Sequence, residues 1–403
     1  MSRYWIPALR PNTSQKLTFS PLALWACLVL VLAACGEPEV SQSESVTPSS
    51  EPRLEALAEI QETRPGNIAV TPQGRVIITN QPLDSPRLRV VEVMADGSTE
   101  PFPNLDWADG PESGEVGIAA TIGIASSTKG VVWILDMGGE GVSPRLLAWD
   151  SADDDSLLRE IEIAPAAVTA VSFLQDFALD EKRQQIYIAD MTFPPPGETP
   201  RPAFIVVDLE SGESRRVLEG TEPLMPVPHD VVIRNPLAST GLMGTRLESG
   251  ESAAWHLALN PIAIDPDFEW VYFGTVNGDE VFRIPAEGLA NAALDEQELS
   301  AQIEVYGEKR PSDGIAVDGE GRVFISDIEA SAIGVTTPQG YEVLVQDDRR
   351  LAWPDGFALA ADGSLYVTQN QLFAHPALNE GVDETTKPFH ILRLDLGELP
   401  AQR

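Results

Sequence analysis

The residues best suited to chemistry are carboxylates and amides that stand at the ends of short apolar runs. If the fold gathers such groups round one axis, their oxygens could bind a polar ligand or a hard cation such as Ca²⁺, which takes six to eight oxygen ligands. An Asp-Gly pair before a strand can equally cap a turn, so a structural role stays open. The candidate ligand-binding residues are Asp176, Asn260, Asp313, Asp355 and Asn370.

A repeated unit explains how these residues could be brought together. The stretch 312–327 reads as an apolar run, an Asp/Gly turn, a second apolar run and a closing Asp, which is typical of a β-hairpin. Degenerate copies begin near residues 66, 122, 176, 261, 312 and 355. Two further strand-like runs follow most copies. Six units of about four strands predict an all-β fold, a six-bladed β-propeller.

The last unit is one strand short before the chain ends. It offers Phe389–Leu394 as a third strand and nothing after it. The segment Leu54–Gln61, just before the first hairpin, could supply the outer strand. We therefore predict that the last blade is closed by an N-terminal strand, which leaves no long open edge.

The predicted channel makes the start of each innermost strand the place to look for a site, because these starts open on one face of the axis. One insertion, about 220–260, departs from the repeat and is rich in Pro, Gly and Ser. We predict that it leans over the channel mouth, where His229 is its candidate general base. An inert surface histidine is the alternative. The motifs of zinc proteases, P-loop proteins and serine hydrolases are absent from the sequence.

The net charge of the chain limits the classes of molecule that it could bind. The 403 residues carry a formal net charge of −35, and the sequence pI is about 4.3. Nucleic acids and anionic lipids attract basic surfaces, so we expect no nucleic acid partner. A secreted acidic protein that attracts cations fits better, and we expect a monomer that binds a small molecule.

The N-terminus has the features of a targeting segment. Basic residues precede an apolar run from Leu22 to Ala34 that is too short to span a bilayer, and Cys35 follows. This resembles a bacterial lipoprotein signal, which implies lipidation of Cys35 and a location on the cell envelope. A plain signal peptide is the alternative. Removal of the signal also removes Cys27, so the mature chain could form no disulfide.

The expected domain organisation follows from these boundaries. Residues 1–34 are a lipoprotein signal peptide, and residues 35–53, rich in Ser, Glu and Pro, are a disordered tether to the membrane. Residues 54–397 form the six-bladed propeller, and residues 398–403 are a C-terminal tail.

Several motifs resemble the yellow and major royal jelly protein family. They are Ile262–Pro266 with Trp270–Gly274, Glu280–Pro285, Arg310–Gly314, Leu351–Gly356 and Asn370–Leu372. The likeness extends over about 330 residues and is strongest after Trp255. It implies a six-bladed propeller, usually secreted. Some members convert dopachrome, others bind biogenic amines or serve as structural proteins, and bacterial relatives are often described as related to dopachrome tautomerase.

A more distant resemblance is to the gluconolactonase and senescence-marker-protein-30 family. It implies a divalent metal held by a Glu, two Asn and an Asp, with lactone hydrolysis as the activity. Asp313 and Asn260 match two of these positions, Gln175 stands at the second Asn, and the Glu has no counterpart near Arg64. The resemblance therefore makes Gln175, Asn260 and Asp313 candidate metal ligands and Asp313 the candidate catalytic base.

Three classes of function remain open from the sequence. The first is a tethered protein that binds a small aromatic or indole-type ligand, with dopachrome-tautomerase-like activity as its enzymatic form. The second is a metal-dependent lactonase. The third is a structural or interaction lipoprotein without activity.

Overall fold

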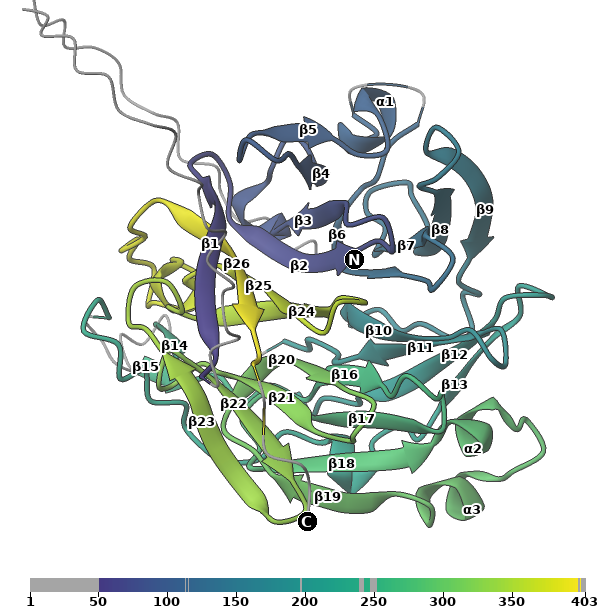
Figure 1. Cartoon of the computed structure of the whole chain (residues 1–403). Helices are drawn as coiled ribbons and strands as arrows, with labels where there is room; N and C mark the ends of the chain where they lie inside the picture. Colours follow the sequence, from purple (N-terminus) through teal and green to yellow (C-terminus); the bar gives the residue numbers. More distant parts are fainter. Residues whose placement is uncertain are drawn as a thin grey trace, which may run out of the picture. The chain divides into compact units, whose positions relative to one another are not determined.

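The computed structural model describes residues 51–397 and 399, apart from 113, 115, 196–197, 239–242 and 247–251. These residues form six four-stranded antiparallel sheets, which confirms the predicted six-bladed β-propeller. Figure 1 shows the sheets arranged as blades around a common centre. The expected signal peptide, Cys35 and most of the tether and tail lie outside the described residues.

The strands follow the repeat in chain order. Blade 1 contains β2 (Pro65–Val70), β3 (Val76–Asn80), β4 (Val90–Val93) and β5 (Thr99–Pro101). Blade 2 contains β6 (Thr121–Ser126), β7 (Val131–Asp136), β8 (Arg145–Asp150) and β9 (Ser156–Glu162). Blade 3 contains β10 (Leu174–Asp180), β11 (Gln185–Asp190), β12 (Ala203–Asp208) and β13 (Ser214–Val217).

The second half repeats the pattern. Blade 4 contains β16 (Leu259–Ile264), β17 (Trp270–Thr275), β18 (Glu280–Pro285) and β19 (Glu304–Glu308). Blade 5 contains β20 (Ser312–Val317), β21 (Val323–Asp327), β22 (Ala332–Thr337) and β23 (Gly340–Gln346). Blade 6 contains β24 (Pro354–Leu359), β25 (Leu365–Gln369), β26 (Phe389–Asp395) and β1 (Arg53–Ile60).

Strand β1 holds the outermost position of blade 6. It pairs antiparallel with β26, from Arg53 opposite Asp395 to Ile60 opposite Phe389. The sheet of this blade therefore combines the two ends of the propeller, and the outer edge of β26 is covered.

Elements outside the blades are short. They are α1 (Leu105–Ala108), α2 (Ala286–Ala290), α3 (Glu296–Ser300), η1 (Pro82–Asp84), η2 (Glu222–Leu224), η3 (Leu372–Ala374), β14 (Gly244–Arg246) and β15 (Ser252–Ala254). The pair β14 and β15 belongs to the insertion. Among the described residues, every helix is too short or too polar to cross a membrane.

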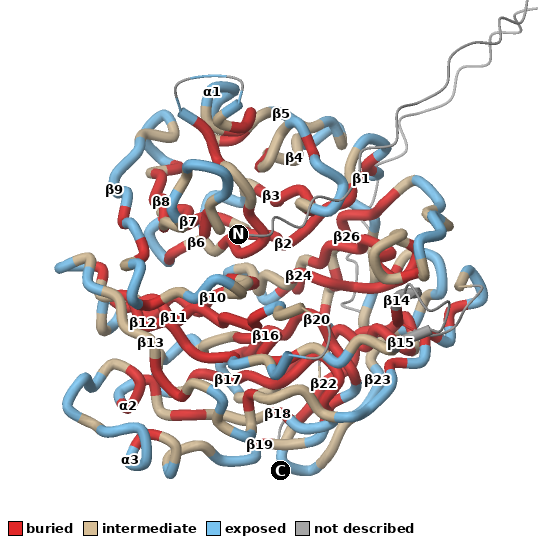
Figure 2. The backbone as a smooth tube through the Cα atoms, turned by 180° about the vertical axis from the view of Figure 1, so that it is seen from behind, coloured by how far each residue is buried: buried red, intermediate tan, exposed pale blue. Residues whose placement is uncertain are grey.

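The core lies between the blades. Alternating side chains of each sheet pack on the next blade, and six apolar clusters of described residues fill the six interfaces. Each innermost strand also contacts the innermost strands of both neighbours, and β24 and β2 close the ring. Figure 2 shows buried residues along the inner and middle strands and exposed residues on the outer ones.

The ring has two distinct faces. The turns that join the first and second strands of each blade, such as 318–322 in blade 5, form the hairpin-turn face. The opposite face, where the innermost strands begin, is called the strand-start face below. A seventh apolar cluster lies on the strand-start face.

Candidate functional site

Every innermost strand is irregular near its start. The pairing with the second strand shifts register between Pro65 and Ile68 in blade 1, and between Ser312 and Ile315 in blade 5, and equivalent shifts occur in the other four blades. A β-bulge turns side chains away from the regular pleat. The polar residues that the sequence singled out lie at these bulges, which explains how they can face the axis.

Hydroxyl groups of the second strands stabilise three of the bulges. The hydroxyl of Ser326 accepts hydrogen bonds from the backbone N–H groups of Asp313 (3.0 Å) and Gly314 (2.8 Å). That of Thr368 accepts from Gly356 N–H (2.9 Å) and donates to the carbonyl of Gly66 in the next blade. Backbone donors that the ladder leaves free are thus satisfied, and neighbouring blades are joined.

Blade 1 repeats this arrangement. The hydroxyl of Thr79 accepts from Asn67 N–H (2.9 Å) and donates to the carbonyl of Ile122 (2.8 Å). The sequence analysis did not identify these hydroxyls. Their signal is a Ser or Thr one residue before the polar end of the second strand, in blades 1, 5 and 6 but not in blades 2 to 4.

Close approach of the innermost strands requires glycine. A Cβ atom added to Gly314 would overlap the carbonyl oxygen of Asp355, and one added to Gly356 would overlap Asn67. Gly314 and Gly356 therefore serve to bring the starts of β20, β24 and β2 together, beyond any role in a turn.

Asp313 is held by two donors. Its carboxylate accepts hydrogen bonds from the indole N–H of Trp353 (2.8 Å) and from the side-chain amide of Asn260 (2.8 Å). Trp353 is buried, and its backbone lies in the left-handed region at φ 59°. Strained conformations of bulky residues persist where the surroundings require them, often at functional sites. Here the strain places the indole on Asp313.

Asp355 forms a carboxyl pair with Asp313. The two carboxyl groups are hydrogen-bonded to each other, and Asn370 donates its side-chain amide to Asp355. Burial, followed by the negative charges of Asp313 and Asp176, raises the pKa of Asp355 well above its usual range. Burial also raises the pKa of Asp313. Of the two carboxyl groups, Asp355 therefore holds a proton more readily than Asp313.

A third carboxyl group completes the site. Asp176 accepts hydrogen bonds from the side-chain amide of Asn67 (2.9 Å) and from Phe177 N–H (2.8 Å). Burial is the main cause that raises the pKa of Asp176 to about 7, and the charge of Asp313 adds to it. Asp176 thus changes between its acid and base forms in the physiological pH range.

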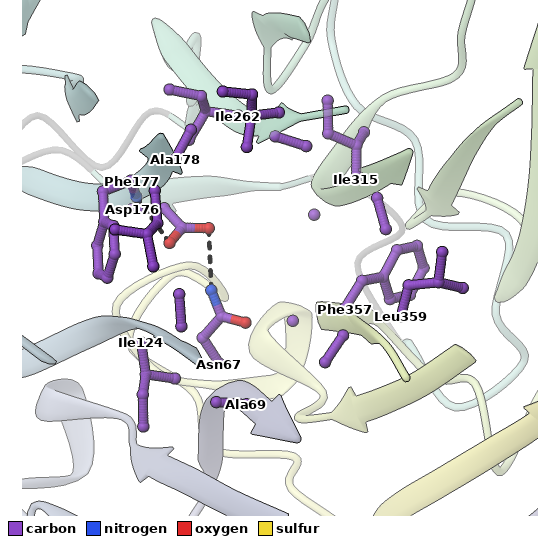
Figure 3. Close-up of a pocket in the computed structure, with 18 of the residues that line it drawn as sticks. Asn67, Ala69, Ile124, Asp176, Phe177, Ala178, Ile262, Ile315, Phe357 and Leu359 are labelled. Carbon is purple, nitrogen blue, oxygen red and sulfur yellow. Dashed lines mark hydrogen bonds between the residues drawn. The ribbon is translucent and has the colours of Figure 1, made fainter. Parts of the chain in front are cut away.

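These groups lie at one end of a central cavity of about 310 Å³. All six innermost strands line it, and beyond the carboxyl groups its walls are aliphatic or aromatic, with Ile124, Ile262, Ile315 and Phe357 among them (Figure 3). The lining residues include five carboxyl groups and no Lys, Arg or His. The carboxyl groups are those of Asp176, Glu181, Asp265, Asp313 and Asp355.

One buried acceptor at this end has no protein partner. Asn260 is 1% exposed, and its amide nitrogen donates to Asp313, while its Oδ1 atom has no hydrogen bond among the described residues. A buried acceptor without a partner is costly, so this atom is suited to a donor on a ligand.

The predicted residues divide into two groups. Gln175, Asp176, Asn260, Asp313 and Asp355 line the cavity. Asn370 acts from behind, through Asp355. His229 is absent from the cavity lining, its side chain is 51% exposed, and its partner is Glu329 at 3.9 Å. Asn67 and Trp353 also belong to the site and were missed.

The residues do not fit a resident divalent metal. Both oxygens of Asp313 already accept hydrogen bonds, one from Asn260 and one from Trp353. At the position where the distant family has a Glu, Arg64 donates to the carbonyl of Gln371 (2.9 Å). No group of three or more His, Cys, Asp or Glu among the described residues could hold a metal ion.

Comparisons with known proteins agree with this architecture. The sequence profile described as Major royal jelly protein matches residues 121–403. No curated protein sequence matches the chain significantly. The fold is similar to that of a gluconolactonase from Xanthomonas campestris, with 12% identity, a TM-score of 0.52, and coverage of 90% of this chain and 95% of that chain.

A luciferin-regenerating enzyme is also similar, with 12% identity, a TM-score of 0.50, and coverage of 85% of this chain and 95% of that chain. At such identities the two solved structures bear on the fold alone.

Proposed function

Because the chain belongs to the major royal jelly protein family, and because its cavity combines apolar walls with carboxyl groups as the only ionisable side chains, we propose that the propeller binds a small organic cation. The best match is an amine with an aromatic or indole-type body. The observation that carries this proposal is the cavity lining of five carboxyl groups without a basic side chain. Its volume of about 310 Å³ is at the lower end of small-molecule sites.

The two ends of such a ligand would meet different surroundings. The ammonium group would donate to Asp176, to the carboxyl pair and to the free Oδ1 atom of Asn260. The ring would pack on the aliphatic and aromatic wall. The net charge of −35 would raise the local concentration of cations and speed their association.

Three 3-substituted indoles whose side chains differ in charge test this proposal. Calorimetry with tryptamine, tryptophol and indole-3-acetate compares a cation, a neutral alcohol and an anion on one ring. We expect tryptamine to bind most tightly and indole-3-acetate to show no binding. Tryptamine binding should release protons near pH 7, because a cation favours ionised Asp176. Tighter binding of the anion would exclude the proposal.

A matched pair of variants locates the interaction. Asp176→Asn removes a carboxylate from the cavity, whereas Asp153→Asn removes one from an exposed turn. We expect Asp176→Asn to weaken tryptamine binding about tenfold, since a charge-assisted hydrogen bond contributes roughly 1.5–3 kcal/mol, and Asp153→Asn to leave it unchanged. Equal effects would indicate nonspecific attraction to an acidic protein.

Proton transfer on the bound molecule is a second candidate function. It is favoured by one observation: the same cavity holds Asp355, whose pKa is raised well above its usual range, and Asp176, whose pKa is raised to about 7. An acid and a base on one ligand are what a tautomerase requires. Loss of dopachrome with wild type and Asp176→Asn tests it, and equal rates would remove Asp176 from the mechanism.

The charge of the cavity refines this second test. Dopachrome carries a carboxylate, which the lining carboxyl groups disfavour, so its decarboxylated analogue should react faster. Lactone hydrolysis, by contrast, requires a metal that the residues do not fit. If the purified protein contained a stoichiometric divalent metal and hydrolysed lactones, lactone hydrolysis would be favoured over proton transfer.

Attachment to the cell envelope through lipid on Cys35 is also proposed. The support is the small-residue stretch before Cys35 and the acyl-anchor pattern of the N-terminus. Labelling with a radioactive fatty acid tests it with Cys35→Ser and Cys27→Ser as a matched pair. Only Cys35→Ser should abolish incorporation; unchanged labelling would refute the anchor.

A further inference from the structure

The carboxyl end of the cavity is closed on the strand-start face. The seventh apolar cluster, called the plug below, joins residues that follow second strands with residues that precede innermost strands and with the insertion. Its buried members are Met191, Val231, Ile233, Met243, Ala258, Val276, Ile328, Ala352, Trp353, Leu372, Phe373 and Ala374. Blades 3 to 6 all contribute to it. The plug includes Trp353, whose indole is bonded to Asp313.

Buried polar residues fix the plug in place. The side chain of Asn277 donates to the carbonyls of His229 (2.7 Å) and Trp255 (2.8 Å), and it accepts from Leu257 N–H (2.8 Å). Glu329 accepts from Val232 N–H (2.8 Å). These bonds attach the insertion to blades 4 and 5 from within. These satisfied buried polar groups favour a fixed cover over a lid that opens.

In blades 1, 2, 4 and 6, exposure rises along the innermost strand toward the other face; in blade 5 it does not change, and in blade 3 Asp176 is more exposed than the residues that follow it. At the closed end, Asn260, Asp355 and Asp313 are 1%, 4% and 7% exposed. At the far end, Ile264 and Leu359 are partly exposed. The lining residues run from the carboxyl groups to the hairpin turns, and none belongs to the loops that precede the innermost strands.

The rim at the hairpin-turn face is acidic and partly aromatic. Thr128, Glu181, Asp265 and Phe268 lie on it. Glu181 of blade 3 accepts hydrogen bonds from the N–H (2.6 Å) and the hydroxyl (2.8 Å) of Thr128 in blade 2. Asp265 accepts from the N–H groups of its own turn, which leaves its charge at the opening.

We propose that ligands reach the three carboxyl groups only through the hairpin-turn face, and that Glu181, Asp265 and Phe268 select which molecules enter. The proposal deepens the proposed function and rests on it for the identity of the ligand. The route itself depends only on the plug, the exposure gradient and the rim. It also assigns His229, on the plugged face, no part in the site.

The route can be tested without any ligand, because the sequence contains only two cysteines, Cys27 and Cys35. With both changed to Ser, Ala263→Cys places one thiol on the cavity wall, partway along it. Its reaction with a cationic trimethylammonium methanethiosulfonate is compared with that of the anionic sulfonate reagent. We expect the cationic reagent to react about tenfold faster, because an acidic rim concentrates cations.

Two bulky substitutions then distinguish the faces. Thr128→Trp lies at the rim, and Val232→Trp lies on the plugged face, where Val232 is 45% exposed. We expect Thr128→Trp to slow labelling several-fold and Val232→Trp to leave the rate unchanged. Glu181→Gln should lower the ratio of the labelling rate with the cationic reagent to that with the anionic reagent. If Val232→Trp slows labelling and Thr128→Trp does not, the route is through the other face and the proposal is wrong.

Two controls keep the outcomes separate. Ala125→Cys and Ala358→Cys occupy the equivalent position in blades 2 and 6, so they replace Ala263→Cys if that variant does not fold. Labelling that follows the predicted pattern in a protein that binds no tryptamine would uphold the route and remove the amine proposal. If the protein binds tryptamine but labelling is slowed by Val232→Trp and not by Thr128→Trp, the amine proposal stands and the proposed route is wrong.

Discussion

The two ends of the central channel are built from the same six strands and differ in nearly every property. At the strand-start end the strands are bulged, and buried carboxyl groups are held by amides, hydroxyls and an indole. At the hairpin-turn end the pairing is regular, the wall is aliphatic, and the carboxyl groups of Glu181 and Asp265 lie on the rim. A repeat that tolerates irregularity at one end can therefore hold charged groups without loss of the scaffold.

The two ends should differ most in how much a substitution that crowds the backbone lowers the free energy of unfolding. Gly314→Ala, at the bulged end of β20, would bring Cβ onto the carbonyl of Asp355, and we expect a loss of about 3 kcal/mol in the free energy of unfolding, as for overpacking. Gly319→Ala, at the turn end of the same hairpin, meets nothing within 4 Å and should be neutral. Urea unfolding of both variants measures the contrast, and equal losses would contradict it.

Replacing Asp313 and replacing Asp355 by Asn should change the free energy of unfolding by different amounts. Asp313→Asn turns an amide N–H₂ toward either Trp353 or Asn260, both donors, and we expect it to cost about 1–3 kcal/mol. Asp355→Asn reproduces the protonated acid, since its amide can donate to Asp313 and its oxygen can accept from Asn370.

We therefore expect Asp355→Asn to change stability by less than about 0.5 kcal/mol at pH 7. Chemical unfolding of the two variants gives both values in one experiment. A large loss for Asp355→Asn would mean that Asp355 is ionised and that the proton lies elsewhere.

The effect expected from Asp176 depends on pH. Its pKa is about 7 in the folded protein against a usual 3.8, so the folded state binds the proton more tightly than the unfolded state. Stability should therefore fall as pH rises from about 4 to about 7 and then level off. Asp176→Asn removes this loss.

We expect Asp176→Asn to raise the melting temperature by about 2–4 °C at pH 8 and to give no gain near pH 4, where Asp176 is already neutral. Thermal unfolding across this range is the measurement, with Asp153→Asn as the exposed control. A gain that is the same at both pH values would show that charge at Asp176 is not its cause.

The parts of this architecture that the sequence predicted are those set by local pattern. Alternating apolar runs with Asp/Gly turns predict the hairpins, and polar residues at the starts of the innermost strands, such as Asp313 and Asp355, are visible in the last four of the six copies. Their position at the channel follows from the repeat alone, because equivalent residues of a propeller converge on its axis.

Other features depend on contacts distant in sequence. The bond from Trp353 to Asp313 requires a left-handed backbone that a tryptophan rarely adopts. The role of Asn67 appears only when the starts of β2 and β10, from blades 1 and 3, meet at the axis. The direction in which the cavity opens is set by how the insertion packs, and the composition of that insertion does not reveal which of its residues become buried.

The direction of β1 determines from which face of the propeller the chain enters blade 6. Because Arg53 pairs with Asp395 and Ile60 with Phe389, the chain enters the outer edge of blade 6 from the hairpin-turn face. If Cys35 is lipidated, as proposed above, the link to the membrane reaches the propeller through β1. The opening of the cavity would then share its face with the point of attachment, so that molecules gathered at the lipid–water boundary would meet the acidic rim before those in bulk solvent.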